Sequence, residues 1–176
     1  STDNSTPQAG AAYVFRRTGS TWAQEAYIKP SVAVENATFG TSVSLVGDSL
    51  AVGALYEDGA HSVTSNSLIA GGGGAVFIYN RTGSTWAQLT YFKAANNITN
   101  NKFGSTLSLS ADTLAVGDFS EGSNQSTITN GATASSNTSQ SYSGATYIYR
   151  RIASTWTQEA YIKAKNNDAS DYFGYA

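Results

Sequence analysis

The sequence predicts an all-β chain made of small four-stranded antiparallel sheets that repeat along its length. Three observations support this fold class. Near-copies of one phrase occur at 18–29, 82–93 and 153–163. Segments rich in Val, Ile, Tyr, Phe, Trp and Thr alternate with turns of Gly, Asp, Asn and Ser. No segment carries the 3.6-residue apolar period of an amphipathic helix.

Two landmarks define the repeat. Trp22, Trp86 and Trp156 are separated by 64 and 70 residues, and the dipeptide Phe-Gly, which begins at residues 39, 103 and 173, keeps the same separations. Because two independent landmarks stay in step, the chain contains a true structural repeat. The expected units are the second half of a unit at 1–29, full units at 30–93 and 94–163, and the start of another at 164–176.

Each full unit is expected to form four strands. In the first, strands 41–46 and 49–54 flank the tight turn Gly47-Asp48, and strands 75–80 and 85–93 flank a turn that contains Gly83. The strands expected in the other units are 11–15, 22–29, 105–110, 113–118, 144–151 and 154–163.

The side-chain pattern of these strands favours a particular architecture. The third strand of each unit is a nearly continuous apolar run, as in residues 75–79, so both of its faces should be buried. In the fourth strand the residues alternate between two faces of mixed polarity, with Trp22, Gln24, Ala26 and Ile28 on one face and Ala23, Glu25, Tyr27 and Lys29 on the other. This mixed pattern suits an outer edge. Sheets of this kind, buried on both faces, are typical of β-propeller blades. A β-sandwich is the alternative, although its strands should alternate throughout.

The strand-and-turn pattern of Phe39–Ala54, "FGTSVSLVGDSLAVGA", resembles the FG-GAP repeat of integrin-α-type β-propellers, and Gly10–Lys29 resembles the second half of its bacterial branch. The resemblance implies a partial propeller of about 2.7 blades, whereas rings close with roughly four to eight. We therefore expect the chain to be a window on a longer repeat array, or its ring to be completed by other copies.

The resemblance also raises the question of calcium, which integrin repeats hold in a turn of the Asp-X-Asp-X-Asp-Gly type. Here the corresponding turns are Gly47-Asp48 and Ala111-Asp112, each with a single carboxylate. Since Ca²⁺ takes six to eight oxygen ligands, calcium binding is not carried over. No cofactor and no metal site are expected; a weak calcium site at Asp118 and Glu121 is the alternative, although the calcium motif is absent.

The composition limits the possible partners. Only 12% of residues are charged and the net charge is −2, so nucleic acid is not expected as a partner. No apolar run approaches the ~18 residues of a membrane span, and there is no Cys. Ser and Thr contribute 44 residues. Asn-X-Ser/Thr sequons indicate a glycosylated extracellular or cell-surface protein, with candidate acceptors at Asn4, Asn36, Asn80, Asn97, Asn124 and Asn137.

Function is expected in the long connections, which all belong at one end of the blades. Tyr56, Glu57, Asp58 and His61 form the densest polar group there, and Asp118 and Glu121 occupy similar positions in the next unit. They are candidate ligand-binding residues, but a single His cannot form a zinc set.

No nucleophile–base pair supports catalysis. The expected function is adhesion, or a building unit of an extracellular coat or filament, with further repeats or other copies as partners. The alternatives are a module that binds a glycan or protein ligand through the long loops, and a scaffold domain of a larger secreted protein.

Overall fold

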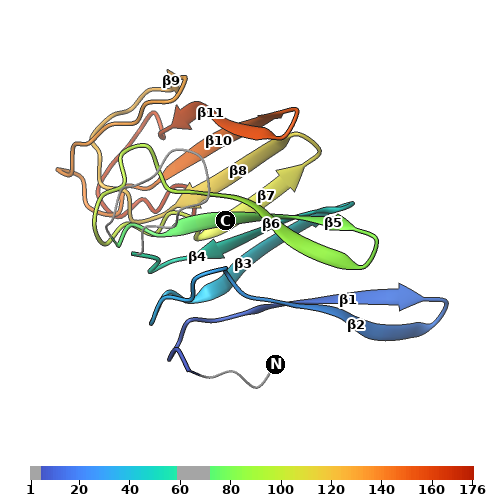
Figure 1. Ribbon diagram of the computed structural model, residues 1–176. Coiled ribbons are helices and arrows are strands. Elements are labelled where there is room, and N and C mark those ends of the chain that lie inside the picture. Colours follow the sequence, from blue (N-terminus) through green and yellow to red (C-terminus); the bar gives the residue numbers. More distant parts are fainter. Residues whose placement is uncertain (1–4, 59–71) are drawn as a thin grey trace.

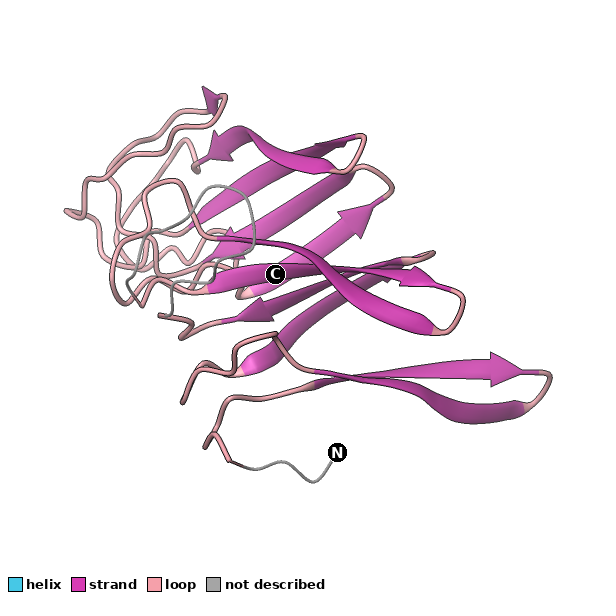
Figure 2. Ribbon diagram, viewed as in Figure 1, coloured by secondary structure: helices cyan, strands magenta, loops and turns pink. Residues whose placement is uncertain are grey.

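The computed structural model describes residues 5–58 and 72–176. Within these ranges the chain has no helix and forms three antiparallel sheets of two, four and five strands (Figures 1 and 2). The expected all-β class is confirmed. The unit limits expected after residues 29, 93 and 163 fall in connections between sheets, and the division into units stays a prediction.

The sheets follow one another along the chain. The half-blade consists of β1 (Ala12–Thr18) and β2 (Thr21–Ile28). The first blade has the order β3 (Phe39–Val46), β4 (Ser49–Ala54), β5 (Ala75–Thr82) and β6 (Thr85–Phe92). The second blade has the order β7 (Thr106–Ser110), β8 (Thr113–Asp118), β10 (Ala145–Ile152), β11 (Thr155–Ile162) and the short β9 (Thr129–Asn130).

The three sheets are stacked, with their hairpin turns gathered at one end and their long connections at the other (Figure 1). This arrangement follows from strands that run up and down in sequence order, because each short turn is followed by a return to the opposite end. We call the two ends the short-turn end and the long-loop end.

Strand β5 shows why the third strand is apolar on both sides. Ala75, Phe77 and Tyr79 belong to the core cluster shared with the half-blade. Val76 and Ile78 belong to the cluster shared with the second blade. A strand buried between two neighbouring sheets has no solvent face, so its sequence need not alternate.

The outer strands differ from the expected simple alternation. Each pair of third and fourth strands contains a β-bulge; in the first blade Ile78 pairs with Thr90 and Tyr79 with Gln88, so Leu89 is passed over. The bulge skips Glu25 and Glu159 at the equivalent points of the other two pairs. Because one extra residue inverts the facing of all that follow it, a strict period of two was wrong beyond the bulge.

The Phe-Gly dipeptide joins each blade to the one before it. Gly10 forms a parallel bridge with Phe39, and Gly74 forms the same bridge with Phe103. The amide of Phe39 donates to the carbonyl of Ala9 at 2.8 Å, and that of Phe103 to Gly73 at 3.1 Å. The Phe103 ring then meets Tyr147 edge-on, with centroids 5.1 Å apart. Backbone pairing and aromatic packing thus fix the start of each blade together.

Two further glycines, in β4 and β8, let these strands approach the Phe-Gly dipeptide of the next unit closely. A Cβ atom added at Gly53 would lie under 3.0 Å from the Gly104 carbonyl of the next blade, and one at Gly117 would meet the Gly174 carbonyl in the same way. A side-chain hydroxyl forms a hydrogen bond at each contact. The Ser42 hydroxyl donates to the Gly104 carbonyl at 2.6 Å, and the Thr106 hydroxyl donates to the Gly174 carbonyl at 2.9 Å. We call these contacts the inter-blade junctions.

The junction predicts the effect of adding one methyl group. Gly53→Ala should lower the free energy of unfolding by about 3 kcal/mol, because the new Cβ meets backbone that cannot rotate away. Gly72→Ala is the matched control, since among the described residues its Cβ would meet Asp58 at an ordinary 3.7 Å. Urea unfolding of both variants checks this; equal stabilities would contradict a tight junction.

Candidate binding site at the long-loop end

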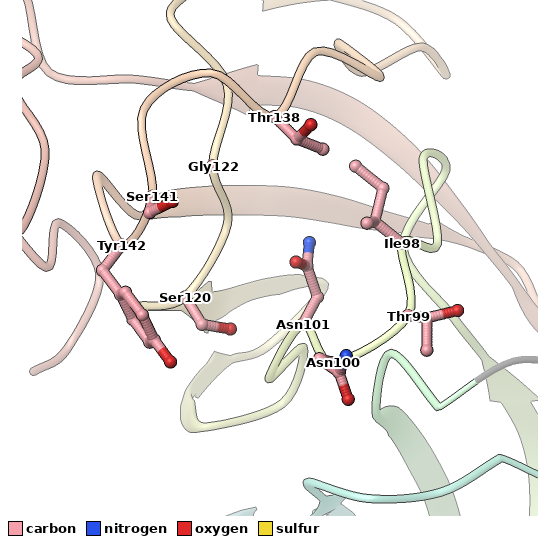
Figure 3. A pocket seen from close by; sticks show the side chains of 9 residues that line it. All are labelled: Ile98, Thr99, Asn100, Asn101, Ser120, Gly122, Thr138, Ser141 and Tyr142. Atoms are coloured by element: carbon pink, nitrogen blue, oxygen red, sulfur yellow. The ribbon is translucent and has the colours of Figure 1, made fainter.

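A pocket of about 190 Å³ lies at the long-loop end, between the β6–β7 connection and the β8–β10 connection (Figure 3). The two connections belong to successive blades, so the pocket depends on the stacking described above. Its lining residues are Ile98, Thr99, Asn100, Asn101, Ser120, Gly122, Thr138, Ser141 and Tyr142.

The pocket is lined by neutral hydrogen-bonding groups. Hydroxyls and amides predominate, and none of the lining residues carries a formal charge. Asn101 is only 5% exposed, and its Nδ2 has no hydrogen-bond partner within the described ranges. Figure 3 shows its amide directed into the space that the labelled side chains enclose. An unsatisfied buried donor is costly, so this position favours a ligand or water that supplies an acceptor.

Asp118, at the end of β8, ties the two connections together. Its Oδ1 accepts from the Lys102 amide at 2.9 Å, and from the Ser120 amide at 3.2 Å and hydroxyl at 3.0 Å. The side chain is fully buried. Burial raises the pKa of Asp118 to about 6, against the lowering effect of these hydrogen bonds.

A buried ion pair joins the end of β11 to the β8–β10 connection at the long-loop end. Lys163 Nζ lies 2.6 Å from Glu121 Oε2 and also donates to the Ser143 hydroxyl and the Gly144 carbonyl. Both charged side chains are completely buried. The first blade has a related arrangement, in which buried Lys93 donates to the carbonyls of Glu57 and Gly74. Burial lowers the pKa of both lysines, although the nearby carboxylates oppose this.

The structure places the sequence-predicted ligand residues in two environments. Glu57, Asp118 and Glu121 are buried, so their side chains contribute to the conformation of the connections in which they lie. Tyr56 and Asp58 are exposed, and Lys102 Nζ lies 4.4 Å above the Tyr56 ring. None of these residues lines the pocket, and His61 lies outside the described residues. Their role in ligand binding stays a prediction.

The pocket residues themselves were missed in the sequence. Ile98–Asn101 belongs to the Asn-rich stretch 96–101, and Thr138–Tyr142 belongs to a Ser-rich loop. Neither stretch carries the charged groups that usually single out a site. The sequence pointed to the pocket only through the cluster of Asn residues in 96–101, which follows the strand expected at 85–93.

The sequons are distributed unevenly. Asn36, Asn124 and Asn137 are exposed, whereas Asn80 and Asn97 are half-buried. Asn80 Oδ1 accepts from the Ser49 hydroxyl at 3.1 Å. Asn4 lies outside the described residues. Glycan occupancy stays a prediction.

The short-turn end has no group suited to calcium. Asp48 Oδ1 lies 2.7 Å from Arg81 Nε and 2.6 Å from its Nη2, and Asp112 binds Arg151 in the same way at 2.8 Å. A lone carboxylate engaged by a guanidinium does not fit a hard cation. Residues 5–58 and 72–176 contain no group of three His, Asp or Glu side chains arranged for a metal. The same residues form no helix long and apolar enough to cross a membrane.

Comparison with known families agrees with this architecture. Residues 22–79 match the family model of the FG-GAP repeat, so the resemblance seen in the sequence is confirmed over this range. The matched residues run from β2 through β5 and include the first Phe-Gly dipeptide. The FG-GAP repeat is a β-propeller repeat, and such repeats are usually non-catalytic. Comparison with curated proteins found no match.

The raised pKa of Asp118 predicts a pH-dependent stability. Its folded pKa of about 6 exceeds the ordinary 3.8, so the folded chain holds this proton more tightly than the unfolded chain. The stabilising contribution is therefore complete below pH 3.8 and is lost as pH rises through 6. The stability of the native protein relative to Asp118→Asn should fall by about 2 kcal/mol between pH 4 and pH 7.

Denaturant unfolding across this pH range measures the difference. Ser110→Ala, which changes an exposed side chain and removes no ionisable group, is the control and should keep the pH dependence of the native chain. If the free energies of unfolding of the native chain and Asp118→Asn differ by the same amount at every pH, this result would contradict a buried, ionisable Asp118.

Proposed function

We propose that this chain is a non-catalytic, extracellular adhesion module that binds a neutral glycan in the pocket of the long-loop end. The observation that carries the proposal is the lining of that pocket, with Asn101 Nδ2 buried among hydroxyls and amides and without a partner among the described residues. Sugars present many hydroxyl groups that both donate and accept. Such a ligand matches a site of uncharged donors and acceptors better than an ionic ligand does.

The chemistry of the pocket is suited to binding. A hydrolytic site needs an acid or base within hydrogen-bond reach of the substrate, and the lining offers neutral side chains. The nearby titratable groups, Asp118 and Glu121, are turned inward and engaged by hydrogen bonds. Tyr142 is exposed at the pocket and offers an aromatic surface against which a sugar ring can pack.

An extracellular or cell-surface setting is part of the proposal. Solubility comes from hydroxyl and amide groups rather than from charge, and exposed Asn36, Asn124 and Asn137 are available to glycosylation. Rigid stacked sheets that present loops at one end suit recognition at a surface.

A second candidate function is a building unit of a coat or filament. It is favoured by the outer side of the half-blade, where Tyr13, Phe15 and Trp22 are each more than half exposed. A further repeat, or another copy of the chain, would cover these aromatic side chains.

A glycan array probed with the native chain and with Asn101→Ala tests the proposal. The native chain should bind a small set of neutral glycans, and loss of the amide should weaken binding about tenfold. Ser84→Ala at the short-turn end is the control and should bind as the native chain does. An array on which the native chain binds no glycan, or binding that Asn101→Ala leaves unchanged, would contradict the proposal.

A further inference from the structure

A second depression lies away from the long-loop pocket, between β2 of the half-blade and β5 and β6 of the first blade. Its volume is about 280 Å³. We call it the outer groove; its lining residues are Ala26, Tyr27, Ile28, Lys29, Ser31, Tyr79, Trp86 and Gln88. Three aromatic side chains and one amide therefore form much of its surface.

Gln88 presents an unsatisfied donor in this groove. Its Oε1 accepts from the backbone amide of Ser31 at 3.2 Å and from the Tyr79 hydroxyl at 3.4 Å. Because a backbone amide can only donate, this contact fixes which end of the side-chain amide is oxygen. Nε2 is buried and has no hydrogen-bond partner in the described part of the chain. The two hydrogens of Nε2 are therefore free to donate to acceptors of a bound partner.

The next repeat shows how the same position is satisfied. Gln158 is the equivalent of Gln88 one unit later, 70 residues along the chain. Its Nε2 donates to the backbone carbonyls of Gly131 at 3.1 Å and Thr133 at 2.9 Å. Segment 129–134 lies over this side chain, and Gly131 also donates its amide to the Glu159 carbonyl at 2.7 Å.

Segment 129–134 also seals the aromatic surface beneath it. Its first two residues form β9, which pairs with Ala160 and Tyr161 of β11. Ala134 packs against the core cluster that contains Trp156. Trp156 is buried here, while its equivalent Trp86 remains partly exposed at the outer groove. The second blade therefore has segment 129–134 over its Gln and Trp, whereas the described residues of the first blade leave a groove at the equivalent place.

The chemistry of the segment is simple. Residues 129–134 read Thr-Asn-Gly-Ala-Thr-Ala, with small side chains and no charge. Gln158 recognises backbone carbonyls rather than side chains. A segment with the same character could satisfy Gln88 in the same way, because the groove offers the same Gln, Trp and Tyr.

We propose that the outer groove is a docking site for an extended, uncharged peptide segment with small side chains, supplied by a partner protein. Its backbone carbonyls accept from Gln88 Nε2, and its side chains lie against Trp86 and Tyr27. The segment takes the place that 129–134 takes in the second blade. This site is separate from the glycan pocket, and neither proposal depends on the other.

A synthetic peptide of residues 126–136 is the probe, titrated into the full chain by calorimetry. Saturable binding with one peptide per chain is expected. Gln88→Glu should weaken binding at least about tenfold, because it keeps the acceptor for Ser31 and removes the donor. Gln24→Glu is the matched control, since Gln24 is the exposed equivalent in β2 and should leave binding unchanged.

Four outcomes would overturn the proposal. The first is absence of peptide binding to the native chain. The second is equal binding to the native chain and Gln88→Glu, since the peptide would then act at another place, such as the second blade. The third is equal binding of a peptide with the reversed sequence. The fourth is self-association of the chain that the peptide does not inhibit. In that case the groove would bind a different surface of a second copy of the chain. Should Gln88→Glu fail to fold, Gln88→Ala takes its place with the same expected loss.

Discussion

The close approach of backbones at the inter-blade junctions is the constraint on which the rest of the structure depends. Gly53 and Gly117 leave no room for a Cβ atom because the carbonyl of the next Phe-Gly dipeptide occupies that space. A neighbouring hydroxyl from Ser42 or Thr106 satisfies each of these carbonyls. Only glycine permits such contact, so the separation of the sheets is set by backbone atoms rather than by flexible side chains. The buried aromatic and aliphatic clusters then fill the space that this separation defines.

The features at the long-loop end follow from the same stacking. Once the blades are held together, the connection that leaves β6 lies beside the connection that leaves β8, and residues from both enclose one pocket. The buried carboxylates hold these connections in place: Asp118 gathers amides from both, and Glu121 pairs with Lys163. The charged side chains thus lie inside the long-loop end and fix the conformation of the connections, whereas the pocket is lined by neutral groups. This division accounts for a protein with few charged residues and yet several fully buried ones.

Strands could be located from the sequence because turns and landmarks are local. The predicted segments 49–54 and 113–118 coincide with β4 and β8, each bounded by a two-residue turn. The bulges were out of reach because the residues passed over, Leu89, Glu25 and Glu159, share no residue type that marks a bulge. Strand β9 was missed because two residues of a long polar loop carry no strand signal. The burial of Glu57 and Glu121 beside Lys93 and Lys163 could not be predicted, because it depends on chain folding that no local pattern records. The pocket, made by two loops of different blades, was unpredictable for the same reason.

Native-state hydrogen exchange at the Phe39 and Phe103 amides tests the central claim most directly. Both amides belong to Phe-Gly dipeptides and donate to the preceding unit, to Ala9 and Gly73 respectively. If the junction holds the stack together, these amides can exchange only when neighbouring sheets separate. Their opening free energies should then equal that of global unfolding. Exchange as fast as that of an amide in an exposed hairpin turn, such as Ser84, would show that the Phe-Gly contact opens locally and would contradict the account.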